Sequence, residues 1–187
     1  MQSLEPREAE ALFARACAGE SGAFAALVRL HQARVFGIAA RMLSDRAAAE
    51  DLAQDVFLQM FRDLASLDSH EHLRFWLRRV TSHRCIDRLR QSARISLQPL
   101  DCAREVVEGE RGEGPLLRQH LNAVLQELAP AARAVLLLRY QEDLDPAEIA
   151  RTLAMPVNTV KSHLKRSLSV LRSRLAGLKL LDRPLHE

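Results

Sequence analysis

One stretch of the chain gathers side chains that suit contact with nucleic acid. Residues 149–181 contain no Asp or Glu, whereas seven basic residues occur there. An ordinary solvated helix mixes charges of both signs, and a purely basic one repels itself unless a polyanion neutralises it. Amide, hydroxyl, ammonium and guanidinium groups also reach phosphate oxygens and base edges. We therefore predict a nucleic-acid surface made by Asn158, Thr159, Lys161, Ser162, Lys165 and Arg166.

A pair of helices must position these residues. Asp145 can cap a short helix that Pro146 starts, and Glu148 can bond back to the backbone amide of the cap, which completes a capping box. Residues 154–156 end this helix, because proline donates no backbone hydrogen bond and disfavours helix in the residue before it. A longer helix follows, with apolar residues at steps of three and four: Val157, Val160, Leu164, Leu168 and Leu171. So tight a turn between two helices predicts a helix-turn-helix.

The turn itself carries an unusual residue. Ala154 stands where helix-turn-helix proteins often have glycine. If the backbone needs a positive φ there, alanine costs on the order of 1 kcal/mol relative to glycine. The turn is therefore either strained or closed differently.

A second basic block lies nearer the N-terminus. Residues 72–100 contain seven arginines, and Asp87 is the one acid among them. The apolar pattern over residues 73–91 predicts an amphipathic helix, preceded by a polar connector. Residues 101–115 reverse the balance, with five acids and two bases. The chain thus carries two basic blocks separated by an acidic strip.

Composition narrows the class of protein. Of the 187 residues 48% are hydrophobic but only 4% aromatic, which suits an all-α protein and argues against a β-sandwich. No apolar run approaches the ~20 residues that span a bilayer, and no signal peptide is visible at the acidic N-terminus. Cys17, Cys85 and Cys102 are odd in number and far apart, which favours a reducing, cytoplasmic location over a disulfide framework.

The pattern along the chain predicts two small helical domains joined by a flexible linker. Helices are expected over residues 5–18, 24–43, 47–64 and 73–91, and again from residue 116 onwards. Apolar periodicity stops at Ser92, and the acidic segment with glycine and proline that follows cannot bury much. We expect an N-terminal domain over 1–92, a linker over 93–115, a helix-turn-helix domain over 116–178 and a tail over 179–187.

Four segments together resemble a known family. They read AFAALVRLH, AEDLAQDVFLQMF, FWLRRVTSHRCIDRLR and LAPAARAVLLLRYQEDLDPAEIARTLAMPVNTVKSHLKRSLSVLR. In this order they resemble the extracytoplasmic-function sigma factors of bacteria, over roughly residues 8–175. The resemblance implies a non-enzymatic transcription initiation factor that needs no cofactor.

The resemblance also implies roles for particular residues. Asp51, Gln54, Asp55 and Gln59 would dock on the clamp helices of the largest subunit of core RNA polymerase. The connector over 66–72 and the basic helix after it would hold the strand-separated minus-ten promoter element, through Arg74, Arg78, Arg79, His83, Arg84 and Arg88. His83 stands where some relatives carry Asn. The six helix-turn-helix residues would read the minus thirty-five element as duplex, and an anti-sigma factor would be a regulatory partner.

Two other classes of protein remain to be weighed. VNTVKSHL also resembles the recognition helix of conventional transcriptional regulators, although the N-terminal half has no strand–helix alternation typical of a receiver domain. A metal-binding protein would have to use His70, His72, His83, Cys85 and Cys102. His70 and His72 are expected in a loop, His83 and Cys85 stand two residues apart on a helix, and these pairs do not face the same way, so no four-ligand set is evident. No nucleophile–base pair or phosphate-binding glycine loop appears either. We predict no catalytic, cofactor or metal site.

Overall fold

The computed structural model describes residues 5–95 and 113–176. The described residues are almost entirely helical and contain no strand, which confirms the all-α prediction. They belong to two compact units, Met1–Ala103 and Arg104–Glu187. The predicted tail and Cys102 lie outside the described residues.

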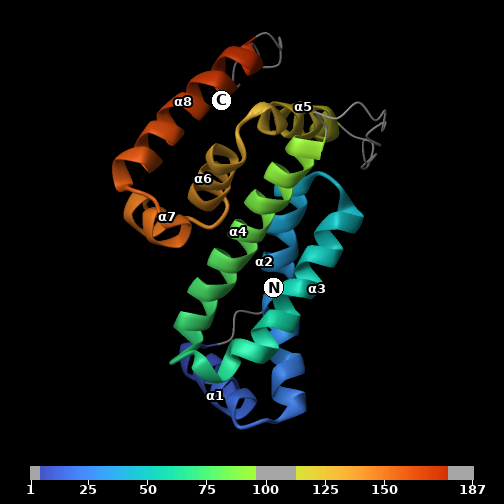
Figure 1. Ribbon diagram of the computed structural model, residues 1–187, viewed down its shortest axis with the longest axis vertical. Coiled ribbons are helices and arrows are strands. Elements are labelled where there is room, and N and C mark those ends of the chain that lie inside the picture. The colour runs from blue at the N-terminus through green and yellow to red at the C-terminus, as the bar shows by residue number, and fades with distance from the viewer. Residues whose placement is uncertain (1–4, 96–112, 177–187) are drawn as a thin grey trace, which may run out of the picture. The chain divides into compact units, whose positions relative to one another are not determined.

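The N-terminal unit is a small bundle built around its second helix. Its elements are α1 (Pro6–Cys17), α2 (Ser21–Leu43), α3 (Arg46–Asp63), the short 3-10 turn η1 (Leu64–Ser66) and α4 (His70–Ile95). α2 packs against α1, α3 and α4, and α3 packs against α4 as well (Figure 1). The arrangement places the polar α3 and the basic α4 side by side.

Apolar side chains from three helices meet inside this bundle. Leu27, Val35 and Met42 lie on one stripe of α2, as their spacing predicts, and are fully buried. Met60 of α3 and Leu77 of α4 are equally enclosed. Burying a side chain of this size stabilises the fold by about 1.5–3 kcal/mol relative to exposure, so this core fixes α3 and α4 against α2.

The C-terminal unit contains α5 (Glu113–Glu127), α6 (Pro130–Tyr140), α7 (Pro146–Leu153) and α8 (Val157–Ala176). α8 packs against each of the other three helices. Leu125 and Leu128 near the end of α5 cluster with Ala132 and Leu136 of α6. The apolar stripe of α8 covers this cluster through partly buried leucines, so its opposite face is left to solvent.

A buried arginine holds α5 and α6 together. Arg133 of α6 is only 3% exposed, and its guanidinium donates to the carbonyl oxygens of Leu125 and Gln126, both at 2.8 Å. It also donates to the side-chain oxygen of Gln126 and to the carbonyl of Leu128 at 3.4 Å. The last carbonyls of a helix lack intrahelical partners and carry partial negative charge, so a cation satisfies both needs.

Both ends of the predicted linker are helical. α4 continues over residues 93–95, and α5 already includes residues 113–115. The sequence prediction was wrong at these ends because helix formation does not require a buried apolar stripe. Pro115 is acceptable where it stands, since amides of the first helical turn have no intrahelical acceptor. Residues 96–112 lie outside the described part of the chain.

Candidate nucleic-acid interfaces

The helix-turn-helix begins with the predicted capping box. The Asp145 carboxylate accepts from the backbone amides of Ala147 at 2.7 Å and Glu148 at 2.8 Å. The Glu148 carboxylate in return accepts from the Asp145 amide at 2.7 Å. The hydrogen bonds from the Glu148 and Ala147 amides lower the pKa of Asp145, against a weaker opposing effect of burial. This closed set of bonds defines where α7 starts.

The turn between α7 and α8 has the positive φ at Ala154 that the sequence analysis considered. Ala154 has φ 51° and ψ 47°, the left-handed region in which glycine is favoured. Its amide bonds to the α7 carbonyls, and the Met155 amide reaches the Ala150 carbonyl at 3.0 Å. Backbone hydrogen bonds therefore close the turn, and Ala154 adopts the strained left-handed conformation that they require.

α8 presents most of the predicted contact residues to solvent. Lys161, Ser162, Lys165 and Arg166 are exposed on one side of the helix, while Val160 on the other side is fully buried. Of the two remaining candidates near the start of the helix, Asn158 is exposed and Thr159 half-buried. Val157 was predicted to be part of the apolar face but is 37% exposed, because it stands at the first position of α8. The six candidates therefore lie together at the N-terminal half of α8.

The basic residues of α4 are less uniform in exposure. Arg79 is exposed, whereas Arg74, Arg78, His83, Arg84 and Arg88 are half-buried. Arg88 donates to the carbonyl of Ala48 in the first turn of α3, at 3.4 Å. The α4 residues thus differ in what they can offer a ligand.

Arg84 bonds to two residues that were predicted to have a different role. Its Nη2 and Nε both donate to the side-chain oxygen of Gln59, at 2.7 and 3.2 Å. Its Nη1 lies 3.6 Å from a carboxylate oxygen of Asp55. The structure therefore brings one predicted DNA contact together with two predicted polymerase contacts.

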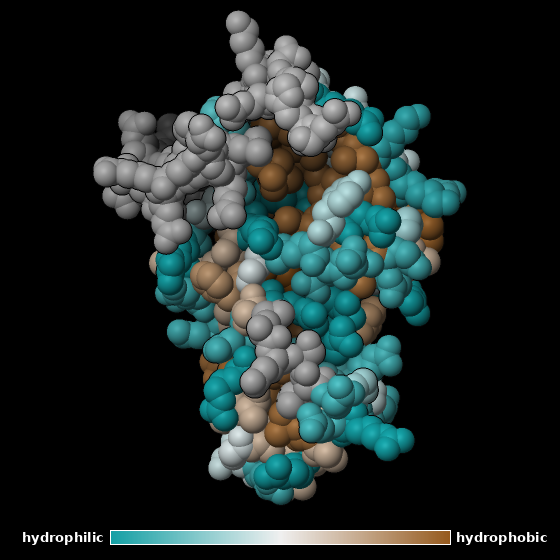
Figure 2. Space-filling model, turned by 180° about the vertical axis from the view of Figure 1, so that it is seen from behind, coloured by the Kyte–Doolittle hydropathy of each residue, from teal (hydrophilic) through white to brown (hydrophobic). Residues whose placement is uncertain are grey.

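The outer face of α3 combines acids with exposed apolar groups. Asp51, Gln54 and Asp55 are exposed, as predicted. Leu58 is 57% exposed and Phe61 is 68% exposed, and steps of three along the helix place both on the same side. The ring of Phe61 packs edge-on against Phe24 of α2, with centroids 5.2 Å apart. On the face shown in Figure 2, hydrophilic side chains cover most of the described surface, with apolar ones grouped between them. Exposed Leu58 and Phe61 thus make the outer face of α3 a mixed polar and apolar surface.

Sequence reasoning placed Leu58 on this face but left it and Phe61 out of the candidate residues. The sequence signal was the spacing of these residues. Leu58 follows Asp55 by three residues and Phe61 follows Leu58 by three, so both fall on the side of the helix that carries Asp55. A large apolar side chain left in water marks an interaction surface when it adjoins others.

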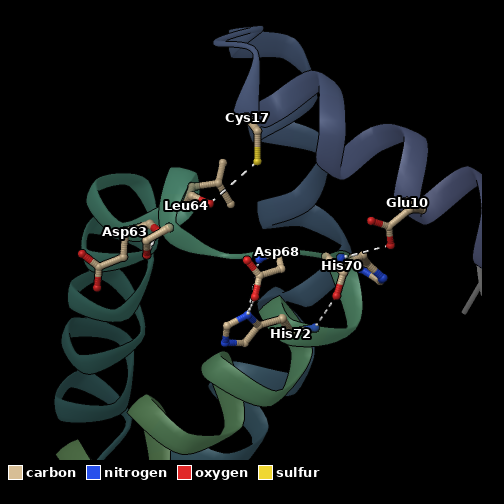
Figure 3. Close-up of polar contacts among 9 residues, drawn as sticks. Glu10, Cys17, Asp63, Leu64, Asp68, His70 and His72 are labelled. Carbon is tan, nitrogen blue, oxygen red and sulfur yellow. Dashed lines mark hydrogen bonds and ion pairs between the residues drawn. The ribbon is translucent and has the colours of Figure 1, made fainter.

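The connector before α4 is anchored by side chains on both sides. Figure 3 shows the backbone amide of His70 donating to the Glu10 carboxylate of α1, at 3.1 Å. The Ser69 hydroxyl accepts from the His72 amide at 3.1 Å, and the Nδ1 atom of His72 accepts from the Asp68 amide at 3.3 Å. The bonds to Glu10 and Ser69 satisfy first-turn amides of α4 and fix where the helix begins.

A buried histidine, His31, pairs with the half-buried His70 beside this connector. The Nε2 atoms of His31 on α2 and His70 are 3.0 Å apart, so one ring donates and the other accepts. Burial, with the nearby charges of His70, Arg34 and Arg74, lowers the pKa of His31 to about 3. Burial and Arg74 also lower the pKa of His70, and Glu10 opposes them. Both rings are therefore neutral near pH 7.

The residues considered for a metal site are separated by the structure. His70 and His72 lie in the first turn of α4 rather than in a loop, where His70 pairs with His31 and His72 accepts from the Asp68 amide. Cys85 is buried, which raises the pKa of its thiol to about 12. Within residues 5–95 and 113–176, no group of three or more His, Cys, Asp or Glu side chains could hold a metal ion. No helix in these ranges has both the length and the apolarity to cross a membrane.

Family models match most of the described helices. The model described as Sigma-70 region 2 matches residues 27–95, which hold most of α2 and all of α3 and α4. The model described as Sigma-70, region 4 matches residues 118–171 and so includes the helix-turn-helix.

Curated relatives extend over both regions. The ECF RNA polymerase sigma factor SigW of Bacillus subtilis is 28% identical over 173 residues, covering 86% of this chain and 92% of its own length. SigE of Mycolicibacterium smegmatis, also an ECF RNA polymerase sigma factor, is 34% identical over 158 residues. That match covers 80% of this chain and 60% of SigE.

Solved structures share the fold. The sigma factor RpoE of Bartonella quintana, solved with the anti-sigma factor NepR, matches with a TM-score of 0.70 and 20% identity, over 86% of this chain and 98% of its own. CnrH, solved with the cytosolic domain of CnrY, matches with a TM-score of 0.66 and 24% identity, over 91% and 99%. Both family regions, in the expected order and on the expected helices, lead to one conclusion: the chain belongs to the extracytoplasmic-function RNA polymerase sigma factors of the sigma-70 family and is an alternative sigma factor directing transcription initiation.

Proposed function

We propose that this sigma factor divides its work among three helix faces. The outer face of α3 docks on core RNA polymerase, the basic face of α4 holds the minus-ten element, and the N-terminal half of α8 reads the minus thirty-five element. The observation that carries the proposal is the exposure of the α8 candidates on a helix without acids, in a unit separate from α3 and α4. In keeping with a family that is generally not enzymatic, we infer no catalytic activity.

The α3 face suits a basic, partly apolar partner surface. Asp51, Gln54 and Asp55 offer carboxylate and amide oxygens, and Gln59 lies beside them. Exposed Leu58 supplies apolar area that solvent alone gives no reason to display. We propose that these residues contact the clamp helices of the largest subunit, with polar groups setting orientation and apolar groups supplying affinity.

The α4 face suits a single strand. Arg74, Arg78, Arg79 and Arg88 bring guanidinium groups that can follow a sugar–phosphate backbone. His83 is half-buried on the same helix, close in sequence to these arginines. We propose that these five residues contact the minus-ten element once its strands have separated, with the anchored connector at the start of α4 limiting where the strand can pass.

The α8 face suits duplex DNA. Asn158, Thr159, Lys161, Ser162, Lys165 and Arg166 occupy the N-terminal half of the second helix of a helix-turn-helix, the part that enters the major groove in such motifs. Base contacts there specify sequence, and lysine and arginine contacts to phosphate position the helix.

We further propose an anti-sigma factor as partner. The structural neighbour RpoE was solved in complex with one. A partner that covers the α4 and α8 faces would block promoter contact without a change in either fold. Because core polymerase and promoter DNA are the proposed ligands, the cytoplasm is the proposed place of action.

In vitro transcription with core polymerase on genomic DNA tests the proposal. We expect discrete start sites that depend on this protein and need no other sigma factor, which a conventional regulator would not produce. The double charge reversal Lys165→Glu with Arg166→Glu should abolish these starts, because repulsion replaces attraction at two phosphates. Association with core polymerase should stay unchanged in that variant. Loss of core association instead would show that the α8 face does not act on DNA alone.

A further inference from the structure

Arg84 lies between the α3 face proposed to dock on polymerase and the α4 face proposed to hold the minus-ten strand. It is carried by α4, yet its hydrogen bonds and its ion pair within the described part of the chain go to α3. Arg79 is an exposed arginine of the same helix and serves as a natural comparison. The two α4 arginines therefore make different use of the same chemical group.

The contacts of Arg84 fix the orientation of a polar side chain on α3. Two guanidinium N–H groups converge on the side-chain oxygen of Gln59, at 2.7 and 3.2 Å. The Gln59 amide nitrogen in turn donates to the Asp63 carboxylate at 3.3 Å. Because both ends of the amide are engaged, its oxygen must point toward α4 and its nitrogen along α3.

The same guanidinium acts on a carboxylate of the docking face. Its Nη1 lies 3.6 Å from Asp55, and the side chains of Arg84 and Asp55 are 40% and 59% exposed. A pair this open to water adds little to folding stability. It does restrict where the carboxylate can lie, and side chains already ordered before binding lose less entropy when a partner docks.

We propose that Arg84 is a positioning residue for polymerase docking, one that orders Gln59 and Asp55 on α3 rather than contacting a promoter phosphate. This inference rests on the proposed docking of α3 on core polymerase. It also links the two faces, because the residue that orders the polymerase face is anchored on the helix that holds the DNA strand.

Core-polymerase affinity of the full chain is the first measurement. Arg84→Ala should weaken binding roughly 3–10-fold, since Gln59 and Asp55 must then be ordered during docking. Arg84→Lys should weaken it nearly as much, because one ammonium group cannot replace a fork that engages two side chains. Arg90→Ala is the matched control: Arg90 is an exposed α4 arginine whose nearby carboxylate, Asp87 at 3.8 Å, lies on α4 itself. It should leave core affinity unchanged.

A double-mutant cycle tests whether Arg84 acts through Gln59. In a Gln59→Ala background, Arg84→Ala should have much less effect on core affinity than in the wild-type chain. Full additivity of the two changes would overturn the inference. Asp51→Ala separates this result from the proposed function, because the hydrogen bonds and the ion pair of Arg84 go to Gln59 and Asp55 rather than to Asp51. If Asp51→Ala weakens core binding and Arg84→Ala does not, only the Arg84 inference is overturned. If neither Asp51→Ala nor Gln59→Ala weakens core binding, the proposal that α3 docks on core polymerase is overturned.

The salt dependence of promoter binding distinguishes positioning from phosphate contact. With core polymerase saturated by each variant, binding to promoter DNA with an exposed non-template strand is measured against salt concentration. Arg79→Ala should lower the slope of log K against log salt by about one, as expected for one lost phosphate contact. Arg84→Ala should leave the slope at the wild-type value. A slope reduced as much as by Arg79→Ala, with core affinity intact, would make Arg84 a DNA contact.

Discussion

At the scale of single residues, His31 and its partner His70 make the stability of the N-terminal unit depend on pH. The folded unit holds His31 neutral, with its pKa lowered to about 3 by burial and by nearby positive charge. An unfolded chain returns histidine to a pKa of about 6.5. Between these values the unfolded state binds more protons, so stability rises with pH, is fully present above about 6.5 and is lost as pH falls toward 3.

His31→Gln should remove this dependence. As pH falls below 6.5, the unfolding free energy of the wild type should fall relative to that of His31→Gln, by up to about 1.4 kcal/mol per pH unit. Urea unfolding followed by Trp76 fluorescence measures it, because this single tryptophan lies on α4. Leu27→Ala is the control: it should cost about 2–5 kcal/mol with no change across pH. Parallel curves for His31→Gln and the wild type would contradict the coupling.

Residues whose roles depend on near neighbours in sequence were predicted well. The capping box of Asp145 and Glu148 forms, and Ala154 adopts the left-handed backbone that its place in the turn suggested. The His31–His70 pair and the Arg84–Gln59 bonds were not predicted, because 39 and 25 residues separate the partners. Nothing in a local pattern says that such distant groups meet.

At the scale of elements, the end of α5 depends on a side chain from α6. Arg133 interrupts an otherwise apolar stretch, and the sequence analysis gave it no role. Its buried guanidinium replaces the solvent that the last α5 carbonyls would otherwise need. The α5–α6 corner is therefore joined by hydrogen bonds as well as by leucine packing.

Arg133→Met should weaken the C-terminal unit strongly although it adds apolar surface. Several buried carbonyls lose their donor, each at about 1–3 kcal/mol, so a total loss of roughly 3 kcal/mol is expected. Circular dichroism follows the helices of the whole chain, and Trp76 fluorescence follows the N-terminal unit separately. The change should appear in the first signal and not the second. Arg172→Ala, an exposed α8 arginine, should alter neither.

Helix positions were predicted to within a few residues wherever an apolar stripe was buried, as in α2 and α3. The extra turns at the end of α4 and the start of α5 were missed because periodicity reports burial, not helix as such. Phe61 was assigned to neither face of α3, because its contact with Phe24, 37 residues earlier in the sequence, cannot be read from a local pattern.

At the scale of the whole molecule, the two compact units carry separate proposed DNA contacts. Arg79 lies in the first unit and Lys165 in the second. Changes at sites without shared partners usually add to within about 0.3–0.5 kcal/mol. Promoter binding by the polymerase complex should therefore show additive losses for Arg79→Ala and Lys165→Ala. A double variant no weaker than the worse single one would mean that one unit engages DNA only after the other.

The exposed Leu58 and Phe61 side chains also have a consequence for the protein when it is not bound to core polymerase. If core polymerase covers these side chains in the complex, as we propose, the free protein exposes them to association with other copies of the chain, and a net charge of +3 gives little electrostatic repulsion against it. The cell thus has a reason to keep the uncomplexed pool small, whatever signal governs its release.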